Sequence, residues 1–365
     1  MERNIDKLRH EIKDLDRELL DLIRRRFKLA EQVGLIKAKQ GRPVVVQEVE
    51  QRVLDRAREA AQGCGVSPEV MEAIFAAIIQ GSVERQHRVG VAHGARGGSR
   101  MLVIGAAGAM GQWIRRFLVS IGHTTEGVDP AWIHAPEKGE FSSLSRITDM
   151  AAFDAVFVSV RLDATTGVLD ELAEYKLSVP VFEIASIKDH LRASIEALSR
   201  TGTPVLSIHP MFGPRKNPFE SLTVVHAVRE DEEKERALIL QSLAHPYMDL
   251  ISMPFERHDR LMGWLLGLAH LNGILFAETL SRSGMDPVEF ERAASTTFRR
   301  QVVTARSVLE EDPGLYFAIQ RLNPYRGEVY AALAESLHEV TGTVERNDCE
   351  AFIRALTRAS AAVLL

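Results

Sequence analysis

The chain has 365 residues, of which 45% are hydrophobic and 26% are charged, enough material for two or three packed domains. Its net charge of −5 at neutral pH argues against partners that bind through charge alone, such as nucleic acids and anionic membrane surfaces. The two cysteines, Cys64 and Cys349, lack the spacing of a metal site and imply no disulfide framework, so we expect no metal. Because no signal peptide opens the sequence and no apolar run reaches membrane-spanning length, we expect a cytoplasmic protein.

Residues 1–90 are predicted to form an all-helical domain. Apolar side chains recur in the first helix at alternating spacings of three and four residues, the pattern of a coiled-coil seam. The seam positions are Ile5, Leu8, Ile12, Leu15, Leu19, Leu22, Leu29, Val33 and Ile36. A helix of about 50 Å cannot bury such a seam in so small a domain, so we expect a second copy of the chain to cover it. Gly41 and Pro43 are predicted to end this helix, and two more helices are expected near 48–61 and 68–87.

A cation interrupts the apolar seam of the first helix. Arg26 occupies a seam position, and a buried guanidinium must reach solvent, pair with a carboxylate or bind an anionic ligand. Lys37 lies about three turns further along the same face, and Ser82 and Gln86 share a face of the third helix. These cations and neutral donors are typical of a pocket for a dianion. An arginine that extends to solvent along the edge of a coiled coil is the alternative interpretation.

The remaining chain changes character twice. Residues 91–99 are glycine-rich and are predicted to form a linker. In residues 100–253 short β-rich runs alternate with helical stretches, which predicts a doubly wound α/β domain. The candidate strands are 101–105, 124–129, 154–160, 180–185, 204–209, 222–228 and 248–252. Residues 254–365 are predicted to be helical again and to form a packing domain with another dimer surface.

A glycine-rich turn follows the first candidate strand of the α/β region. Its spacing is G-x-x-G-x-x-G, and its residues include Gly105, Gly108, Ala109, Met110 and Gly111. Such glycines let the backbone approach a pyrophosphate that lies at a helix N-terminus, as in Rossmann-like domains. Asp129, at the end of the second strand, can accept a hydrogen bond from a ribose 2′-hydroxyl and repel a 2′-phosphate, which favours NAD over NADP. A structural turn without a ligand is the alternative.

A histidine stands where the strand 204–209 meets residues that cannot extend it. His209 is followed by Pro210, which removes a ladder donor, and by the turn at Gly213-Pro214. The imidazole is therefore predicted to lie at the end of a strand, facing a bound dinucleotide, as a candidate acid or base. A structural histidine is the alternative.

The helical region resembles the all-helical chorismate mutases. The resemblance rests on the run from Leu8 to Lys37 and on single residues further along, namely Arg42, Pro43, Glu50, Ser82 and Gln86. In that family two subunits of an intertwined dimer share each site. The resemblance implies that Arg26, Lys37 and the partner subunit's Arg9 bind the substrate carboxylates and ether oxygen, with Glu50, Ser82 and Gln86 completing the pocket. The reaction is a unimolecular rearrangement that needs a folded substrate and nearby cations rather than a nucleophile.

From residue 100 onward the chain resembles the prephenate dehydrogenases. The resemblance rests on the glycine-rich loop, on Ala185-Ser186-Ile187-Lys188, on Ile208–Pro214 and on Glu256-Arg257-His258-Asp259. The two resemblances together imply a fused enzyme of tyrosine biosynthesis. Such an enzyme converts chorismate to prephenate and then, with NAD, oxidises and decarboxylates prephenate to 4-hydroxyphenylpyruvate.

The dehydrogenase resemblance also implies roles for single residues. His209 would accept the proton of the substrate C4 hydroxyl, for which a neutral imidazole is suited. Ser186 would orient His209 or the same hydroxyl, or else serve only as a turn hydroxyl. His270 would contact the substrate side chain, or else be a histidine of the protein core.

Two positions depart from the family patterns. Val49 stands where the mutases usually have an arginine, and Ser307 stands where the dehydrogenases usually have one to hold a substrate carboxylate. Arg306 and Arg299 are the candidates to replace the missing clamp, although one residue step on a helix rotates a side chain by about 100°. Two alternatives therefore remain: a dehydrogenase for arogenate or an amino-substituted prephenate, and N-terminal helices that serve only dimerisation or regulation.

Overall fold

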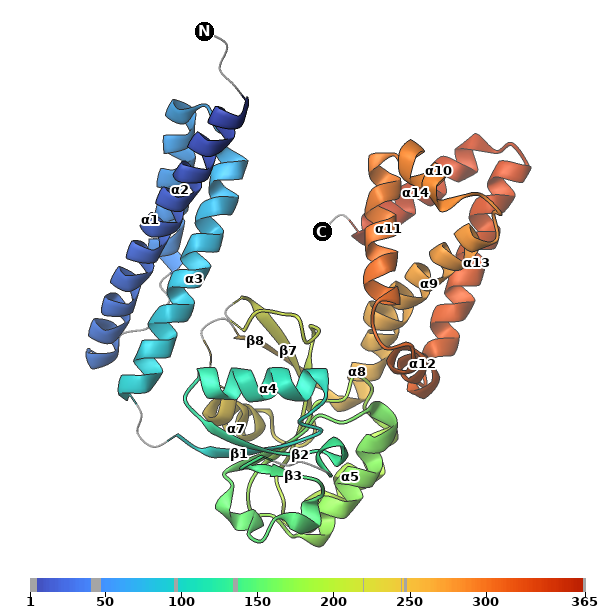
Figure 1. Cartoon of the computed structure of the whole chain (residues 1–365). Coiled ribbons are helices and arrows are strands. Elements are labelled where there is room, and N and C mark those ends of the chain that lie inside the picture. Colours follow the sequence, from blue (N-terminus) through green and yellow to red (C-terminus); the bar gives the residue numbers. More distant parts are fainter. Residues whose placement is uncertain are drawn as a thin grey trace.

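The computed structural model describes residues 5–40, 47–94, 98–133, 137–218, 220–243, 245 and 248–363. Over this part of the chain, a set of helices, a sheet with helices on both faces and a second set of helices follow one another (Figure 1). This arrangement confirms the predicted multidomain α and α/β fold. Gly41, Arg42 and Pro43, expected near the end of the first helix, lie outside the described residues.

In residues 5–40 and 47–94 the N-terminal part forms three helices: α1 (Ile5–Lys39), α2 (Gln47–Cys64) and α3 (Pro68–Gly94). The hydroxyl of Ser67 accepts a hydrogen bond from the N–H of Val70 at 3.2 Å and caps the start of α3. The helix continues to Gly94, past the predicted end near residue 87, because glycines weaken a helix without ending it. Gln80 of α3 donates a hydrogen bond to Glu220 at 2.9 Å, which ties this part to the sheet domain.

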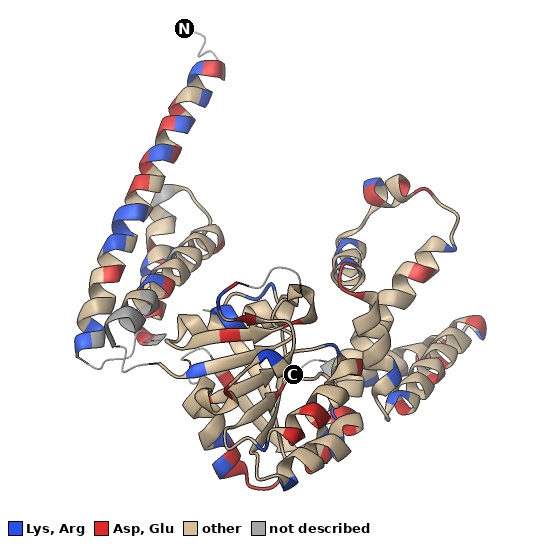
Figure 2. Ribbon diagram, turned by 60° about the horizontal axis from the view of Figure 1, so that its bottom comes forward, with Lys and Arg blue, Asp and Glu red and all other residues tan. Residues whose placement is uncertain are grey.

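Only the second half of α1 packs against α3. A Cβ atom added to Gly34 would lie 2.6 Å from Cα of Gln86, so the two backbones approach very closely there. The first half projects away with its seam uncovered, since Leu15, Leu19 and Leu22 are 57–58% exposed. Acidic and basic residues also run along the length of α1 (Figure 2). One chain therefore leaves an apolar stripe of about five turns open to solvent.

Among the residues that the structure describes, the central sheet has eight strands in the order β3-β2-β1-β4-β5-β6-β7-β8. Their bounds are β1 Arg100–Ile104, β2 Thr124–Val128, β3 Glu140–Phe141, β4 Ala155–Val158, β5 Val181–Glu183, β6 Val205–Pro210, β7 Leu222–Val228 and β8 Met248–Pro254. Strands β1 to β6 are parallel, β7 runs antiparallel to β6, and β8 is parallel to β7. All seven predicted strands are present. The short β3 was missed because two residues carry no readable alternation.

Helices cover both faces of this sheet. The covering helices are α4 (Ala109–Ser120), α5 (Leu162–Glu174), α6 (Arg192–Arg200) and α7 (Glu232–Leu243), and short turns of helix occur at η1 (Pro130–Trp132), η2 (Leu144–Arg146), η3 (Met150–Ala152) and η4 (Asp189–Leu191). Along β1, Leu102 and Ile104 belong to one buried core cluster, while Met101 and Val103 belong to the other. Because side chains alternate across a strand, one continuous apolar run supplies both cores.

The C-terminal part is helical throughout. It consists of α8 (Phe255–Met262), the π-helical segment η5 (Gly263–Leu268), α9 (Ala269–Ser281), α10 (Pro287–Ala293), α11 (Thr296–Leu309), α12 (Pro313–Leu322), α13 (Arg326–Glu345) and α14 (Cys349–Val363). The first three join into one helix, and the carbonyl of Gly267 in its π-helical segment accepts a hydrogen bond from Gln320 at 2.9 Å.

This joined helix is long and apolar. Within the described residues, Phe255–Ser281 is the one helix long and apolar enough to cross a membrane, judged by length and composition alone. The helix reaches this length because three helical segments continue without a break. Only 22% of its most apolar stretch is buried, so much of the apolar surface of this helix is exposed in one chain.

Candidate functional site

The glycine-rich loop forms a tight turn between β1 and α4. Gly105 has φ +81°, and a Cβ atom there would lie 2.3 Å from the carbonyl oxygen of Ser159. A Cβ atom at Gly111 would lie 2.1 Å from the carbonyl oxygen of Gly105, so neither glycine tolerates a side chain. Gly108 caps α4 and has no side chain to cover its N-terminal N–H groups. The loop therefore fits the pyrophosphate of a dinucleotide.

Asp129 fastens this loop to the end of β2. Its two carboxylate oxygens accept hydrogen bonds from the N–H groups of Ala107 at 3.0 Å and Ala131 at 2.9 Å. Each carboxylate oxygen has a second lone pair, so Asp129 can still accept from a ribose hydroxyl. The predicted ribose residue thus also shapes the loop.

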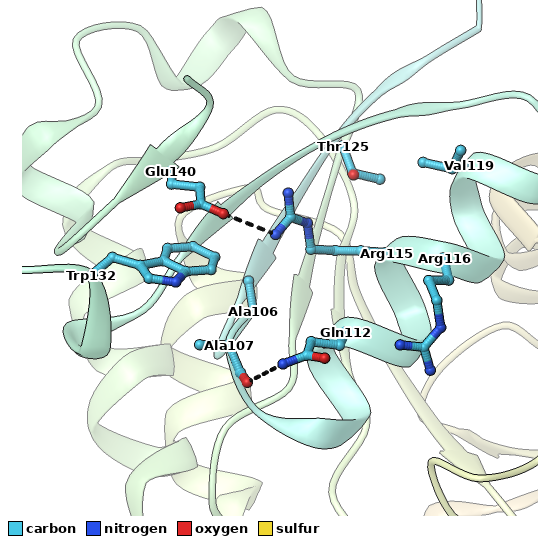
Figure 3. Close-up of a pocket in the computed structure, with 9 residues that line it drawn as sticks. All are labelled: Ala106, Ala107, Gln112, Arg115, Arg116, Val119, Thr125, Trp132 and Glu140. Atoms are coloured by element: carbon cyan, nitrogen blue, oxygen red, sulfur yellow. Dashed lines mark hydrogen bonds and ion pairs between the residues drawn. The ribbon is translucent and has the colours of Figure 1, made fainter. Parts of the chain in front are cut away.

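A cavity of about 490 Å³ opens on the α4 side of the loop (Figure 3). Arg115 is the main feature of its wall, with its guanidinium 5.6 Å from the Trp132 ring centroid and 3.7 Å from the carboxylate of Glu140. Gln112 donates to the carbonyl of Ala107 at 2.8 Å. The lining residues are Ala106, Ala107, Gln112, Arg115, Arg116, Val119, Thr125, Trp132 and Glu140.

A second cavity, about 430 Å³, lies between the carboxyl ends of the strands and α12. His209, near the end of β6, and Ser186, which follows β5, both line it. It is lined by Gly108, Ala109, Met110, Ser159, Val160, Arg161, Leu162, Asp163, Ile184, Ala185, Ser186, His209, Pro210, Phe212, Gly213, Pro214, Asp312, Gly314, Leu315 and Ala318. The phosphate loop and the candidate base therefore face one space.

Ser159 and Arg161 are among the polar residues of this cavity that sequence analysis missed. Ser159 is 9% exposed, and its hydroxyl has no partner among the described residues, so it is free to bind a ligand. Arg161 is the one lysine or arginine that lines this cavity within the described chain, and it pairs with Asp163 at 3.2 Å and reaches Asp312 at 4.0 Å. Both follow β4, and no motif marked them in the sequence.

His209 is held in the wall of the cavity by buried neighbours. Its Nδ1 lies 3.1 Å from Nε2 of His258, and Nδ1 of His258 lies 2.7 Å from Asp259 Oδ1. Burial keeps the pKa of His209 well below 6.5, and the charges of His258 and Lys188 act in the same direction. Burial also lowers the pKa of His258. Both imidazoles are therefore neutral at neutral pH.

A buried lysine supports the strand that carries His209. The ammonium group of Lys188 donates to Glu183 at 2.7 Å and to the carbonyl of Ile208 at 2.9 Å. Glu183 also accepts from the hydroxyl of Ser207, and all of these side chains are fully buried. Burial lowers the pKa of Lys188, although the carboxylate of Glu183 opposes this effect. The sequence marked Lys188 only as part of a motif; its burial depends on tertiary packing.

Three predicted substrate residues do not line the cavity within one chain. His270 packs edge-on against Tyr316, with ring centroids 4.4 Å apart, and burial lowers its pKa to about 4. Arg299 donates to the carbonyl of Glu291 at 2.9 Å, and Arg306 is exposed on α11. The physical reason is that α11 packs against α9 and not along the cavity. Their contact with substrate stays a prediction.

The predicted mutase residues come together between α1, α2 and α3. A small cavity of about 100 Å³ is lined by Arg26, Lys37, Val49, Glu50, Val53, Ile79, Ser82, Val83 and Gln86. Arg26 donates to Ser82 and, at 3.2 Å, to the carbonyl of Ile78. Burial lowers the pKa of Arg26 and also that of Lys37, where Glu50 opposes the effect. Arg26 thus points into the bundle, which argues against the solvent-exposed alternative.

Arg9 lies far from this cavity. Its side chain is 75% exposed and pairs with Asp6 at 3.5 Å. Seventeen residues of helix separate it from Arg26, a distance of about 25 Å. Within one chain Arg9 cannot complete the pocket, so its predicted role depends on a second subunit.

Three family models match successive parts of the chain. Residues 8–87 match chorismate mutase type II, residues 120–245 the nucleotide-binding domain of prephenate dehydrogenase, and residues 254–358 its dimerization domain. The T-protein of Enterobacter agglomerans is 23% identical over 98% of this chain and 92% of its own length. The 4-amino-4-deoxyprephenate dehydrogenase of Streptomyces pristinaespiralis is 25% identical over 70% of this chain and 90% of its own.

Solved structures share the fold of the second and third parts. Prephenate dehydrogenase from Aquifex aeolicus, solved with hydroxyphenyl propionate and NAD+, has a TM-score of 0.60 at 19% identity and covers 73% of this chain and 97% of its own. Synechocystis arogenate dehydrogenase has a TM-score of 0.55 at 18% identity over 72% of this chain and 98% of its own.

Proposed function

We propose residue roles for a chain that belongs to the family in which a type II chorismate mutase is fused to a prephenate dehydrogenase. It rearranges chorismate to prephenate and then oxidises and decarboxylates prephenate to 4-hydroxyphenylpyruvate with NAD, two steps of tyrosine biosynthesis. The division that we propose is a mutase domain at 1–90, a linker at 91–99 whose first four residues continue α3, an NAD-binding domain at 100–253 and a helical domain at 254–365.

The mutase step is assigned to the cavity of the N-terminal helices. Arg26 and Lys37 bind the substrate carboxylates and the ether oxygen, where negative charge develops, and the partner subunit's Arg9 adds a third cation. Glu50, Ser82 and Gln86 complete the pocket. The side-chain amide oxygen (Oε1) of Gln86 is buried and has no hydrogen-bond partner in the described chain, as expected of a group that binds a ligand.

Replacing one cation tests this assignment. Arg26→Gln removes charge that stabilises the transition state, so we expect chorismate consumption without NAD to fall by roughly 100-fold or more. NADH formation from added prephenate should stay unchanged, which controls for folding. A variant that consumes chorismate at the original rate would remove Arg26 from the site.

The dehydrogenase step is assigned to the cavity that His209 lines. Gly105, Gly108, Ala109, Met110 and Gly111 bind the pyrophosphate, and Asp129 binds the adenosine ribose. When bound, NAD supplies the acceptor for the hydride that leaves C4 of the substrate. The cavity of Figure 3 shares Ala107 with the phosphate loop, which supports placing the adenosine end on that side.

His209 takes the proton of the C4 hydroxyl through Nε2. The observation that carries this role is its burial beside the phosphate loop with Nδ1 already facing His258. As the hydroxyl gives its proton to His209 and the hydride leaves C4, the C4 oxygen takes on carbonyl character. The ring carboxylate then departs as CO2, and the electron pair of the broken C–C bond makes the ring aromatic and leaves a phenolate. The phenolate oxygen takes the proton back from His209 and becomes the phenol of the product. Ser186, in the same wall, orients this hydroxyl or the imidazole.

The test is His209→Asn, assayed with prephenate and NAD. We expect NADH formation to fall by roughly 1,000-fold while NAD binding, measured by calorimetry, stays the same. NADH formation near the original rate would refute the assignment of His209.

An amino-substituted prephenate, or arogenate, is the second candidate substrate. The observation that favours it is Ser307, whose hydroxyl donates to the carbonyl of Thr304 in its own helix and leaves no cation at that position. His270, Arg306 and Arg299 are then the remaining candidates for substrate contact, reached from a second subunit. NADH formation measured side by side with prephenate, arogenate and 4-amino-4-deoxyprephenate decides between these substrates.

We also propose that the protein is a cytoplasmic homodimer with small-molecule substrates. The uncovered seam of α1 supports a dimer at the mutase end. Apolar residues exposed on the C-terminal helices, such as Trp264, Leu337 and Val344, support a second dimer contact.

A further inference from the structure

A row of buried polar groups extends behind His209, away from the substrate cavity. His258 is fully buried, Asp259 is 2% exposed, and the row His209–His258–Asp259 is joined by distances of 3.1 and 2.7 Å. The row bridges two domains, since β6 carries His209 and α8 carries the other two residues. The side chain of Asn323 donates to the carbonyl of Asp259 at 2.8 Å, which fixes α8 against α12.

The direction of each hydrogen bond in this row follows from Asp259. Its carboxylate accepts from the N–H groups of Lys188 at 2.9 Å and Asp189 at 2.8 Å. Burial alone would raise the pKa of Asp259, but these bonds and the one from His258 hold it below its usual value. An ionised carboxylate only accepts hydrogen bonds, so Nδ1 of His258 carries a proton.

The tautomer of His209 follows in turn. A neutral His258 with its proton on Nδ1 has a lone pair on Nε2, and this lone pair can only accept. Nδ1 of His209, 3.1 Å away, must then be the donor. A neutral His209 with its proton on Nδ1 has its own lone pair on Nε2, the nitrogen available to the cavity.

We propose that His258 and Asp259 are positioning residues that lock His209 in the tautomer with an unprotonated Nε2 facing the substrate. The proposal rests on the proposed role of His209 as the base. When His209 takes the substrate proton, the same two residues stabilise the imidazolium, because its Nδ1–H remains bonded to an acceptor backed by a carboxylate. Without them, His209 would be free to adopt the tautomer with its proton on Nε2, which cannot accept the hydroxyl proton.

Other charged groups surround the row. Lys188 and Glu183 lie beside His258, and their opposite charges influence it in opposite directions. Lys188 also acts against a positive charge on His209. Lys188 and Glu183 form a fully buried ion pair with each other. None of the variants below changes either residue, so differences between those variants do not come from this pair.

Two substitutions at His258 distinguish the loss of its hydrogen bond to His209 from the loss of side-chain packing. His258→Leu fills the space without an acceptor, whereas His258→Gln can place an amide oxygen near the former Nε2. We expect kcat for NADH formation to fall by roughly 100-fold in H258L and to recover in part in H258Q, with NAD binding unchanged in both. We also expect the acid limb of the kcat profile to move in H258L, which loss of packing alone does not produce.

His226 offers a matched control. It is also fully buried and bonded to a carboxylate, that of Glu235 at 2.8 Å, but it does not line either cavity of the sheet domain. His226→Leu should reduce the melting temperature, as H258L does, without moving the pH profile of kcat. If H226L and H258L shift that profile equally, the positioning role is wrong.

Nitrogen NMR of histidine-labelled full-length protein tests the tautomer without relying on activity. The His209 signals, identified by their loss in H209N, should be those of the Nδ1–H tautomer and should move toward the Nε2–H tautomer in H258L. An Nε2–H tautomer in the unsubstituted protein would overturn the proposal. If H209N abolishes NADH formation but H258L leaves both kcat and tautomer unchanged, positioning fails while His209 remains the base. If H209N is active, the proposed function fails first.

Discussion

At the residue scale, His270 shows how burial changes the pKa of a side chain, which the sequence alone does not reveal. The sequence left two roles open, a substrate contact or a core histidine. In one chain its ring packs against Tyr316, and its Nδ1 has no partner among the described residues. Burial without an acceptor disfavours the charged form, which is why its pKa falls to about 4.

This shift predicts a pH dependence of stability. The unfolded chain protonates His270 near pH 6.5, while the folded chain does so only near pH 4, so unfolding takes up a proton between these values. Stability is therefore full above about pH 6.5 and is lost as the pH falls toward about 4. When the pH is lowered from about 7 to about 5, we expect the melting temperature of His270→Gln to decrease by less than that of the unsubstituted protein. Calorimetry at both pH values measures this difference, and equal losses would show that His270 is not buried as described.

At the scale of the element, the turn between β1 and α4 shows what a sequence pattern can determine. The glycine spacing predicted the loop, and the structure adds the reason: Gly105 has a positive φ and touches the backbone after β4. The seven longer strands were also predicted, and β1, β4 and β6 are the clearest cases because each is an almost wholly buried, mostly apolar run. Lys188, His258 and Arg161 were not assigned, since their neighbours lie on other elements and only tertiary packing joins them.

The same turn supports a prediction about NAD. Gly105→Ala places a Cβ atom 2.3 Å from a backbone oxygen at a φ that alanine disfavours, so the loop must move. We expect NAD affinity, measured by calorimetry, to fall by roughly 10-fold or more, with mutase activity unchanged. Gly167→Ala is the matched control, because Gly167 lies in α5 with open space around it, and alanine there stabilises a helix by about 0.5–1 kcal/mol. Equal affinity in both variants would contradict a role of the loop in binding.

At the scale of the whole molecule, two separate surfaces are available for a second copy. One is the seam of α1, and the other is on the C-terminal helices, at residues such as Leu337 and Val344. A contact between identical patches has its own two-fold axis. If the axes of both contacts coincide, two chains form a closed dimer; if they do not, each chain joins two different partners and larger assemblies result.

Substituting the seam distinguishes these assemblies and tests the shared mutase site. Leu19→Glu places a charge in the middle of the exposed α1 stripe, where Leu19 is 57% exposed in one chain. We expect chorismate consumption to be lost, because the partner subunit's Arg9 no longer reaches the pocket, while NADH formation from prephenate persists. Asp21→Lys changes a charge on nearly the opposite face of the same helix, away from Arg9, and should preserve both activities.

The molar mass in solution completes this test. With coincident axes, light scattering should give a dimer for both the unsubstituted protein and L19E, because the C-terminal contact still holds the variant together. With separate axes, the molar mass of the unsubstituted protein should be larger than that of a dimer, and the molar mass of L19E should be that of a dimer. A variant that keeps full mutase activity as a dimer would show that each mutase pocket is complete within one chain, contrary to the exposed position of Arg9 on α1.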